Sequence, residues 1–149
     1  MHTENAIVMH APFERIFATA GDLSLWPKIL PHYRFITYLE KSKDRNVVRM
    51  AARRGRIPVS WVSEQVIDRE RHEVRFLHLR ALTKGMVVVW TFTRVEEGVL
   101  VRIRHDLNPR IPVIGRFLTE RIIGRFFIAH IATQTLAHMK RYVELTYGA

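Results

Sequence analysis

The sequence contains no cysteine among its 149 residues, which excludes disulfide bonds, thiolate metal ligands and a cysteine nucleophile. Long apolar runs are also missing, because the longest one, 86–90, is far shorter than the roughly 18 residues that span a bilayer. Residues 1–5 have neither the basic start nor the apolar run of a signal peptide. These absences predict a soluble cytoplasmic protein, and the length predicts one domain over residues 1–149.

Clustered metal ligands and phosphate-binding loops are missing as well. The eight histidines are scattered, and His130 and His138 stand two helical turns apart with Gln134 between them. That spacing is too long for one metal ion without further ligands. The glycines are isolated turn residues rather than parts of a phosphate-binding loop. We therefore expect neither a metal nor another cofactor.

Charge is the property that the sequence has in excess. Its 24 Lys and Arg residues outnumber 14 Asp and Glu residues, which gives a formal net charge of +10. Such a balance favours anionic partners, although a solvated basic surface would explain it equally well. Nucleic acid is disfavoured, because the aromatic residues fall on predicted inner strand faces rather than between exposed arginines.

The order of periodic segments predicts an α+β domain. A strand at 4–10 precedes two short helices at 13–20 and 23–26. Six strands then follow with short, turn-like separators, which favours consecutive antiparallel hairpins. These strands are 33–40, 46–53, 57–68, 73–81, 86–95 and 99–107. The pattern predicts a seven-stranded antiparallel sheet.

The last segment, 113–147, has helical spacing and no proline, and we expect Gly124 to bend it. Side chains seldom fill the space under one long helix on a large sheet, so we expect a ligand cavity there. The helical stripe that faces the sheet consists of Ile114, Leu118, Ile128, Ala132, Leu136, Met139 and Val143. A second apolar set, containing Ile123, Phe127 and Ile131, is left over. It packs within the domain, inserts at a lipid surface or forms a homodimer contact.

Several stretches resemble the polyketide aromatase/cyclases of the START-like, helix-grip superfamily. They cover nearly the whole chain and fix the fold more specifically than the reaction. The resemblance implies a seven-stranded sheet curled around a long C-terminal helix, with two short helices after the first strand. The stretches are 5–14, 22–27, Tyr33, 61–68, 86–92, 104–106 and 139–144.

The resemblance also implies a cavity in which a poly-β-ketone undergoes aldol closure and dehydration. Tyr33 matches a cavity tyrosine of that family, and Trp61 and Ser63 match wall positions. Two cavity arginines of the family are replaced by Gln65 and His78. A neutral amide and a part-time cation differ from two permanent cations. A non-catalytic lipid or quinone carrier therefore stays open beside a cyclase/dehydrase.

Strand alternation combined with the resemblance gives the candidate site. We predict His78 and Tyr33 as acid–base residues, although a hydrogen-bonded buried histidine would explain His78 as well. Arg125 either anchors an anionic ligand or extends out through the mouth of the cavity. The predicted cavity residues are Trp61, Ser63, Gln65, Arg80, Trp90, His105 and Arg125.

A group of basic residues is predicted at one end of the sheet, around the cavity mouth. This basic collar consists of Arg53, Arg54, Arg56, Lys84, Arg110 and Arg116. We expect it to meet an acidic acyl carrier protein or an anionic membrane, while the cavity takes a hydrophobic small molecule. A solvated rim is the alternative.

Overall fold

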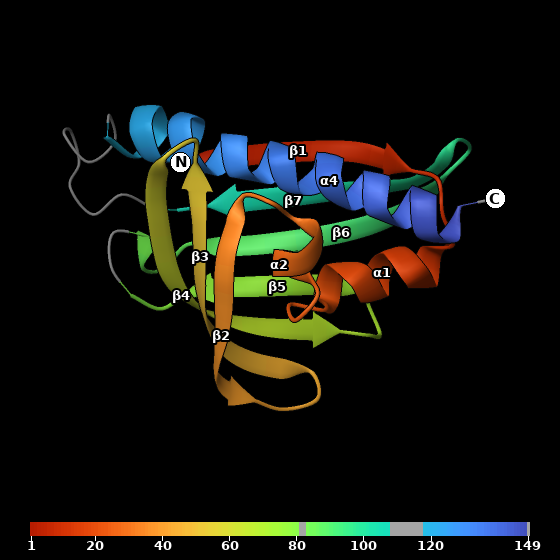
Figure 1. The fold of residues 1–149 in the computed structure, drawn as a ribbon, viewed down its shortest axis with the longest axis horizontal. Coiled ribbons are helices and arrows are strands. Elements are labelled where there is room, and N and C mark those ends of the chain that lie inside the picture. The colour runs from red at the N-terminus through yellow and green to blue at the C-terminus, as the bar shows by residue number, and fades with distance from the viewer. Residues whose placement is uncertain (81–82, 108–117, 149) are drawn as a thin grey trace.

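The computed structural model describes residues 1–80, 83–107 and 118–148, with the backbone alone over 118–120. Its strands and helices follow the predicted order (Figure 1). The elements are β1 (His2–Met9), α1 (Phe13–Gly21), α2 (Trp26–Ile29), β2 (Tyr33–Lys41), β3 (Arg45–Arg54), β4 (Ile57–Asp68), β5 (Glu73–His78), β6 (Val87–Val95), β7 (Gly98–Asp106), η2 (Leu118–Ile128) and α4 (Ala129–Tyr147).

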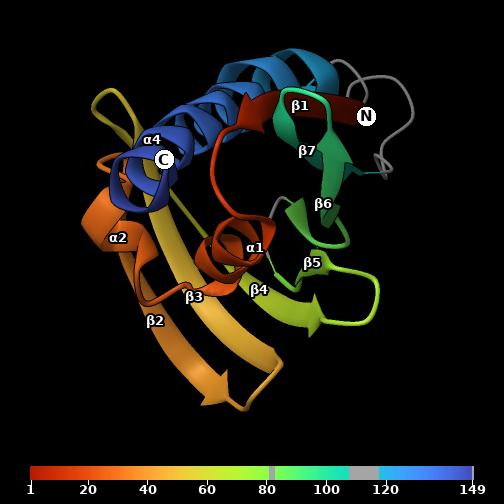
Figure 2. The ribbon, with the colours of Figure 1, turned by 90° about the vertical axis from the view of Figure 1, so that its right-hand side faces the viewer.

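The strands form one seven-stranded sheet in the order β1-β7-β6-β5-β4-β3-β2, and every neighbouring pair is antiparallel. This order confirms the predicted helix-grip architecture. Figure 2 shows a strongly curved sheet with α1 and α4 on its concave side. Because neighbouring strands run in opposite directions, each end of the sheet carries the starts of some strands and the ends of others. The N-terminus lies at one end in Figure 1, and the C-terminus lies at the other.

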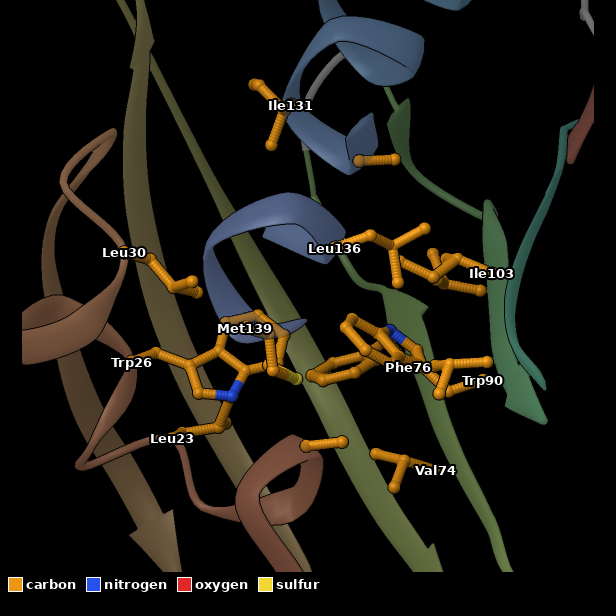
Figure 3. Close-up of a cluster of buried hydrophobic side chains, with 14 of the residues drawn as sticks. Leu23, Trp26, Leu30, Val74, Phe76, Trp90, Ile103, Ile131, Leu136 and Met139 are labelled. Carbon is orange, nitrogen blue, oxygen red and sulfur yellow. The ribbon is translucent and has the colours of Figure 1, made fainter. Parts of the chain in front are cut away.

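A hydrophobic core fills the concave side near the two short helices (Figure 3). The indole of Trp26 from α2 lies 5.5 Å from the Trp90 ring and 6.0 Å from the Phe76 ring, measured between ring centroids. Met139 of α4 is completely buried in the same cluster. Aromatic rings at these separations interlock α2, α4 and the middle of the sheet.

The second short helix begins three residues later than predicted. Asp22 does cap the turn, because its carboxylate accepts the backbone N–H of Ser24 at 3.2 Å. The helix itself starts only at Trp26, where Pro27 occupies its first turn. Proline suits this position because the N–H that it lacks has no partner there.

The C-terminal helix is divided into two segments rather than being one uniform α-helix. The first segment, η2, is π-helical and contains Gly124, and α4 continues from Ala129. A π-helical turn holds more residues than an α-helical turn, so 3.6-residue spacing does not continue unchanged through η2. The predicted stripe member Ile114 lies outside the described residues. The later members of the predicted stripe are all buried: Ile128, Ala132, Leu136, Met139 and Val143.

Strand β2 forms one edge of the sheet. Its pairing with β3 slips between Tyr33 and Phe35 and again between Tyr38 and Glu40. The Arg34 guanidinium lies 5.6 Å from the centre of the Phe35 ring. Each slip is a bulge that bends the strand.

Across the described ranges, we find no helix with the length and apolar character needed to cross a membrane.

Candidate functional site

A cavity of about 330 Å³ lies under η2, at the end of the sheet that carries the N-terminus. It is bounded by the beginnings of β2 and β4, the ends of β5 and β7, the turn before β6, and the junction of η2 with α4. The lining residues are Tyr33, Val59, Ser60, Trp61, His78, Thr83, Met86, His105, Ile122, Ile123, Phe127, Ile128 and Ile131.

A narrower recess of about 50 Å³ continues the cavity toward the core. It shares four residues with the larger space: Tyr33, Trp61, His78 and His105. Trp90 and Thr135 line only the recess. The shared residues therefore form the floor on which a ligand in the larger space would rest.

Trp61 and His78 make a flat part of this floor. Their rings are 5.7 Å apart and only 5° from parallel, because β4 and β5 are neighbouring strands. The Nδ1 atom of His78 is 2.8 Å from the hydroxyl oxygen of Thr83, in the turn after β5. This hydrogen bond fixes the orientation of the ring.

Burial keeps both floor histidines neutral. It lowers the pKa of His78 to about 4. It also lowers the pKa of His105 to about 3, and the nearby His78 lowers it further while Asp106 opposes the shift. The Nδ1 atom of His105 is buried without a hydrogen-bond partner among the described residues. At neutral pH the floor thus offers two uncharged imidazoles.

Tyr33 supplies a hydroxyl group to the same floor. Burial raises the pKa of this phenol above its ordinary value, and a hydrogen bond with Thr135 opposes the rise. The ring packs edge-on against Trp61, with 6.1 Å between centroids. Because the phenol stays protonated, it can donate a hydrogen bond to a ligand oxygen.

The described cavity wall is uncharged. Its polar members are Tyr33, Ser60, His78, Thr83 and His105, and the other described lining residues are apolar or Trp61. No group of three potential metal ligands occurs within residues 1–80, 83–107 and 118–148. The wall suits a neutral ligand with a few oxygen atoms, since a buried ionic group would require a charged partner.

Two predicted anchors, Ser63 and Gln65, face inward but lie away from the cavity. Gln65 donates to the Gly21 carbonyl at 3.1 Å and accepts from Asn46 at 2.9 Å. Ser63 donates to the Leu77 carbonyl at 3.3 Å. Alternation correctly gives the face of the strand, but the end of α1 covers Gln65 and the hydroxyl of Ser63 is bonded to β5. The prediction that they line the cavity is therefore corrected.

Arg80 and Arg125 do not line the cavity either, because both side chains are exposed. Strand β5 ends at His78, so strand alternation does not extend to Arg80 and cannot place its side chain on the same face as His78. Arg125 lies in the π-helical segment, where α-helical spacing no longer predicts the inward face.

The same change of spacing turns the left-over apolar set inward. Ile123, Phe127 and Ile131, for which packing within the domain, a lipid surface and a homodimer contact were the alternatives, line the cavity. Ile123 and Ile131 are buried there. Their side chains are therefore taken up by the site rather than by an outer surface.

The described members of the basic collar lie at the cavity end. Arg53, Arg56 and Lys84 are exposed, whereas Arg110 and Arg116 fall outside the described residues. The Arg54 side chain binds η2, because its Nε atom donates a hydrogen bond to the Phe126 carbonyl at 2.7 Å. Its guanidinium also lies 4.1 Å from the centre of the Phe126 ring. The β3–β4 turn is thereby joined to η2.

The predicted set of cavity residues leaves out part of the observed lining. Val59 precedes Trp61 by two residues, so strand alternation was a sufficient signal for it. Thr135 follows the inward-facing Ile131 by one helical turn. Thr83 has no such signal, because its position depends on how the turn after β5 folds back onto His78.

Comparisons with known proteins agree on one family. Residues 1–144 match the family model described as polyketide cyclase / dehydrase and lipid transport. A Streptomyces halstedii protein with the curated name "Putative polyketide cyclase" is 34% identical over 105 residues, which cover 68% of this chain and 95% of that protein.

Two solved structures share the fold. The Zhui aromatase/cyclase from Streptomyces sp. R1128 superimposes with a TM-score of 0.78 at 19% identity, over 100% of this chain and 99% of its own. A START superfamily protein from Mycobacterium smegmatis gives a TM-score of 0.72 at 12% identity, with 97% and 98% covered. The family model and the Streptomyces halstedii relative show that this chain belongs to the polyketide cyclase/dehydrase and lipid transport family.

Proposed function

We propose that this protein binds a poly-β-ketone in the cavity and promotes its aldol cyclisation and dehydration. His78 would act as the acid–base group, and Tyr33 would act as the hydrogen-bond donor. The observation that carries the proposal is a neutral, hydrogen-bonded His78 that shares the floor of an uncharged cavity with Tyr33. Family membership supports the reaction class.

In the first step, the free nitrogen of His78 takes a proton from a methylene carbon between two carbonyl groups. The resulting enolate carbon attacks a second carbonyl carbon of the same chain, and a carbon–carbon bond forms. The new alkoxide takes a proton from the imidazolium. Burial lowers the pKa of His78 to about 4, so its cationic form gives up the proton readily.

Tyr33 would hold the accepting carbonyl oxygen while negative charge develops on it. Burial keeps the pKa of Tyr33 high, so the phenol donates a hydrogen bond and keeps its own proton. In the dehydration step, a second carbon-bound proton passes to His78 and the hydroxyl group leaves as water. The proton returned by His78 completes that water molecule.

A carrier role is the second candidate, and the uncharged wall favours it. A histidine whose pKa is lowered to about 4 is a weak base, and the described lining provides no permanent cation to hold an enolate. The same space would hold a quinone or another neutral lipid without changing it. Catalysis and carriage differ in their dependence on His78.

The decisive experiment compares three variants with a poly-β-ketone thioester, followed by mass spectrometry of the products. A cyclase requires that His78→Ala loses turnover but still binds the ligand, as measured by tryptophan fluorescence. His10→Ala is the matched control, since His10 is exposed and does not line the described cavity. Ile123→Trp fills the cavity and should abolish binding in either case. Ligand binding without turnover by the unmodified protein would favour the carrier.

Native mass spectrometry of the purified protein provides an independent readout. A released neutral lipid or quinone would identify the cargo of a carrier. An aromatic polyketide would support the cyclase. A cavity that takes up neither class, even when ligand is added, would contradict both functions.

A further inference from the structure

Two segments at the cavity mouth expose apolar side chains beside one another. We call these segments the rim, consisting of the β3–β4 turn over 53–57 and the part of η2 over 121–127. Ile57 is 46% exposed, Ile122 is 43% exposed and Phe126 is 37% exposed. The hydrogen bond from Arg54 to the Phe126 carbonyl joins the two segments. These three side chains therefore belong to one surface rather than to separate sites.

The rim is also strongly basic. Arg53, Arg56, Arg121 and Arg125 are exposed on it, and the sequence has no Asp or Glu at 53–60 or 121–128. Among the described residues, none of the ion pairs involves a rim arginine. The positive charge here is consequently not neutralised by these neighbours.

The opposite end of the sheet has a different charge pattern. Its three turns carry acidic side chains among the basic ones: Asp44, Asp68, Glu70, Glu73, Glu96 and Glu97. Some of these form ion pairs, such as Arg69 with Asp44 at 2.8 Å and Arg75 with Glu73 at 2.7 Å. Charges of both signs compensate one another at that end, whereas basic side chains are the only charged ones on the rim.

We propose that the rim docks on an anionic lipid bilayer. Ile57, Ile122 and Phe126 would enter the headgroup region, and the rim arginines would pair with lipid phosphates. Apolar side chains flanked by arginines are the combination with which proteins bind at a membrane interface. An acidic protein partner would be recognised by the charges, but it gives no reason for protruding apolar side chains on a turn.

The position of the rim gives docking a use. Ile122 is exposed and also lines the cavity, so the docked surface and the cavity wall share a side chain. An apolar ligand partitions into a bilayer, and a mouth held against that bilayer receives it without passage through water. This use rests on the proposed binding function, whereas docking itself does not require a ligand.

Vesicle flotation of the unliganded protein tests the proposal. Phosphatidylcholine vesicles are compared with vesicles that also contain phosphatidylglycerol, at low and high salt. We expect binding to be about tenfold or more tighter with the anionic lipid, since each basic residue near such a surface contributes to attraction. High salt should weaken it.

Paired variants separate the rim from charge and apolarity in general. Ile57→Ser with Phe126→Ser, and separately Arg56→Glu with Arg121→Glu, should each reduce binding about tenfold. The matched controls are Leu145→Ser, which removes a 77% exposed side chain near the C-terminus, and Lys43→Glu in the β2–β3 turn at the opposite end. Both controls should bind as the unmodified protein does. Circular dichroism shows that each variant is folded.

Equal binding to neutral and anionic vesicles would overturn the proposal. So would undiminished binding by both rim variants, or binding to an acidic carrier protein with none to vesicles. Ligand binding is measured separately, in vesicle-free solution, by tryptophan fluorescence. Loss of docking with intact ligand binding would refute only the membrane surface, whereas docking without ligand binding would refute only the cavity function.

Discussion

The two ends of the curved sheet have the same strands but different interiors. Beside α1 and α2, Trp26 lies 5.5 Å from Trp90 and 6.0 Å from Phe76, and only a recess of about 50 Å³ remains there. Toward the N-terminus, Trp61 and His78 stack at 5.7 Å on the floor of a cavity of about 330 Å³. Both ends present aromatic rings from the concave face of the sheet.

The difference comes from the helices that cover each end. Helices α1 and α2 bring large side chains, including Phe17 and Trp26, down onto the sheet. At the other end, η2 contributes Ile123 and Phe127, which leave room above Trp61. The short N-terminal helices therefore decide which part of this fold is core and which part is available for a ligand.

Removing a tryptophan from each end should give the largest contrast. Trp26→Ala should cost about 3–5 kcal/mol of unfolding free energy, because it leaves a void among packed rings. Trp61→Ala should cost less, about 1–2 kcal/mol, because one side of that ring already faces a cavity. Urea denaturation followed by circular dichroism measures both values. Equal losses would mean that the cavity is filled in solution.

Acidification should act on the hollow end through His78. The unfolded chain binds a proton at this histidine near the ordinary pKa, but burial lowers the pKa of His78 in the folded state to about 4. The unfolded state therefore binds more protons between these values, and stability falls as the pH drops from 7 to 4. The loss due to His78 is about 3 kcal/mol.

Urea denaturation at pH 7 and pH 4 tests this contribution. His78→Gln should show a decrease smaller by that amount, while His10→Gln should behave as the unmodified protein. An unchanged decrease in His78→Gln would show that His78 is not kept neutral by burial.

Enlarging a side chain should destabilise the packed end more than the cavity end. Val74→Phe adds volume to a fully buried position in the packed end and should cost about 1–3 kcal/mol. Ile123→Phe adds volume beside the cavity and should cost less than about 1 kcal/mol. Thermal unfolding ranks the two variants. A greater loss for Ile123→Phe would reverse the assignment of packed and hollow ends.

Loss of the Thr83 hydroxyl should have a small effect on stability. Thr83→Val removes the hydrogen bond to His78 Nδ1 and should cost about 1 kcal/mol. If His78 is the acid–base group, turnover should fall more than ligand binding does, because the imidazole is no longer held in one orientation. Thr83→Ser restores the hydroxyl and should recover turnover. If Thr83→Ser fails to recover the turnover that Thr83→Val loses, although ligand binding is intact, the hydrogen bond does not position the imidazole.

The fold was predictable from the sequence because its signals are local. Alternation in 99–107 and the short hairpin separators depend on neighbouring residues, and the observed strand β7, Gly98–Asp106, is displaced from that range by one residue. The resemblance to helix-grip proteins supplied the curvature. The prediction of which strand side chains face inward was also correct for Ser63 and Gln65, which are completely buried.

The division between cavity and core was not predictable in the same way. Gln65 and Trp61 alternate along one strand face, yet α1 covers Gln65 and leaves Trp61 beside the cavity. The placement of Ile123 depended on π-helical spacing, which the apolar pattern does not encode. Thr83 reaches His78 only through a folded turn. Each of these outcomes depends on contacts between segments distant in sequence or on a local change of helix geometry.

The bulged strand β2 bears on how the molecule behaves at high concentration. A straight, apolar edge strand invites a second copy to extend the sheet, and such pairing leads to aggregation. Here the register slips twice, so an incoming strand would meet interrupted rows of backbone donors and acceptors. Arg34 over Phe35 and Lys41 over Tyr38 place positive charges on the aromatic side chains of the same strand. The open, strongly curved sheet is thereby protected at its β2 edge against pairing with a strand of a second copy.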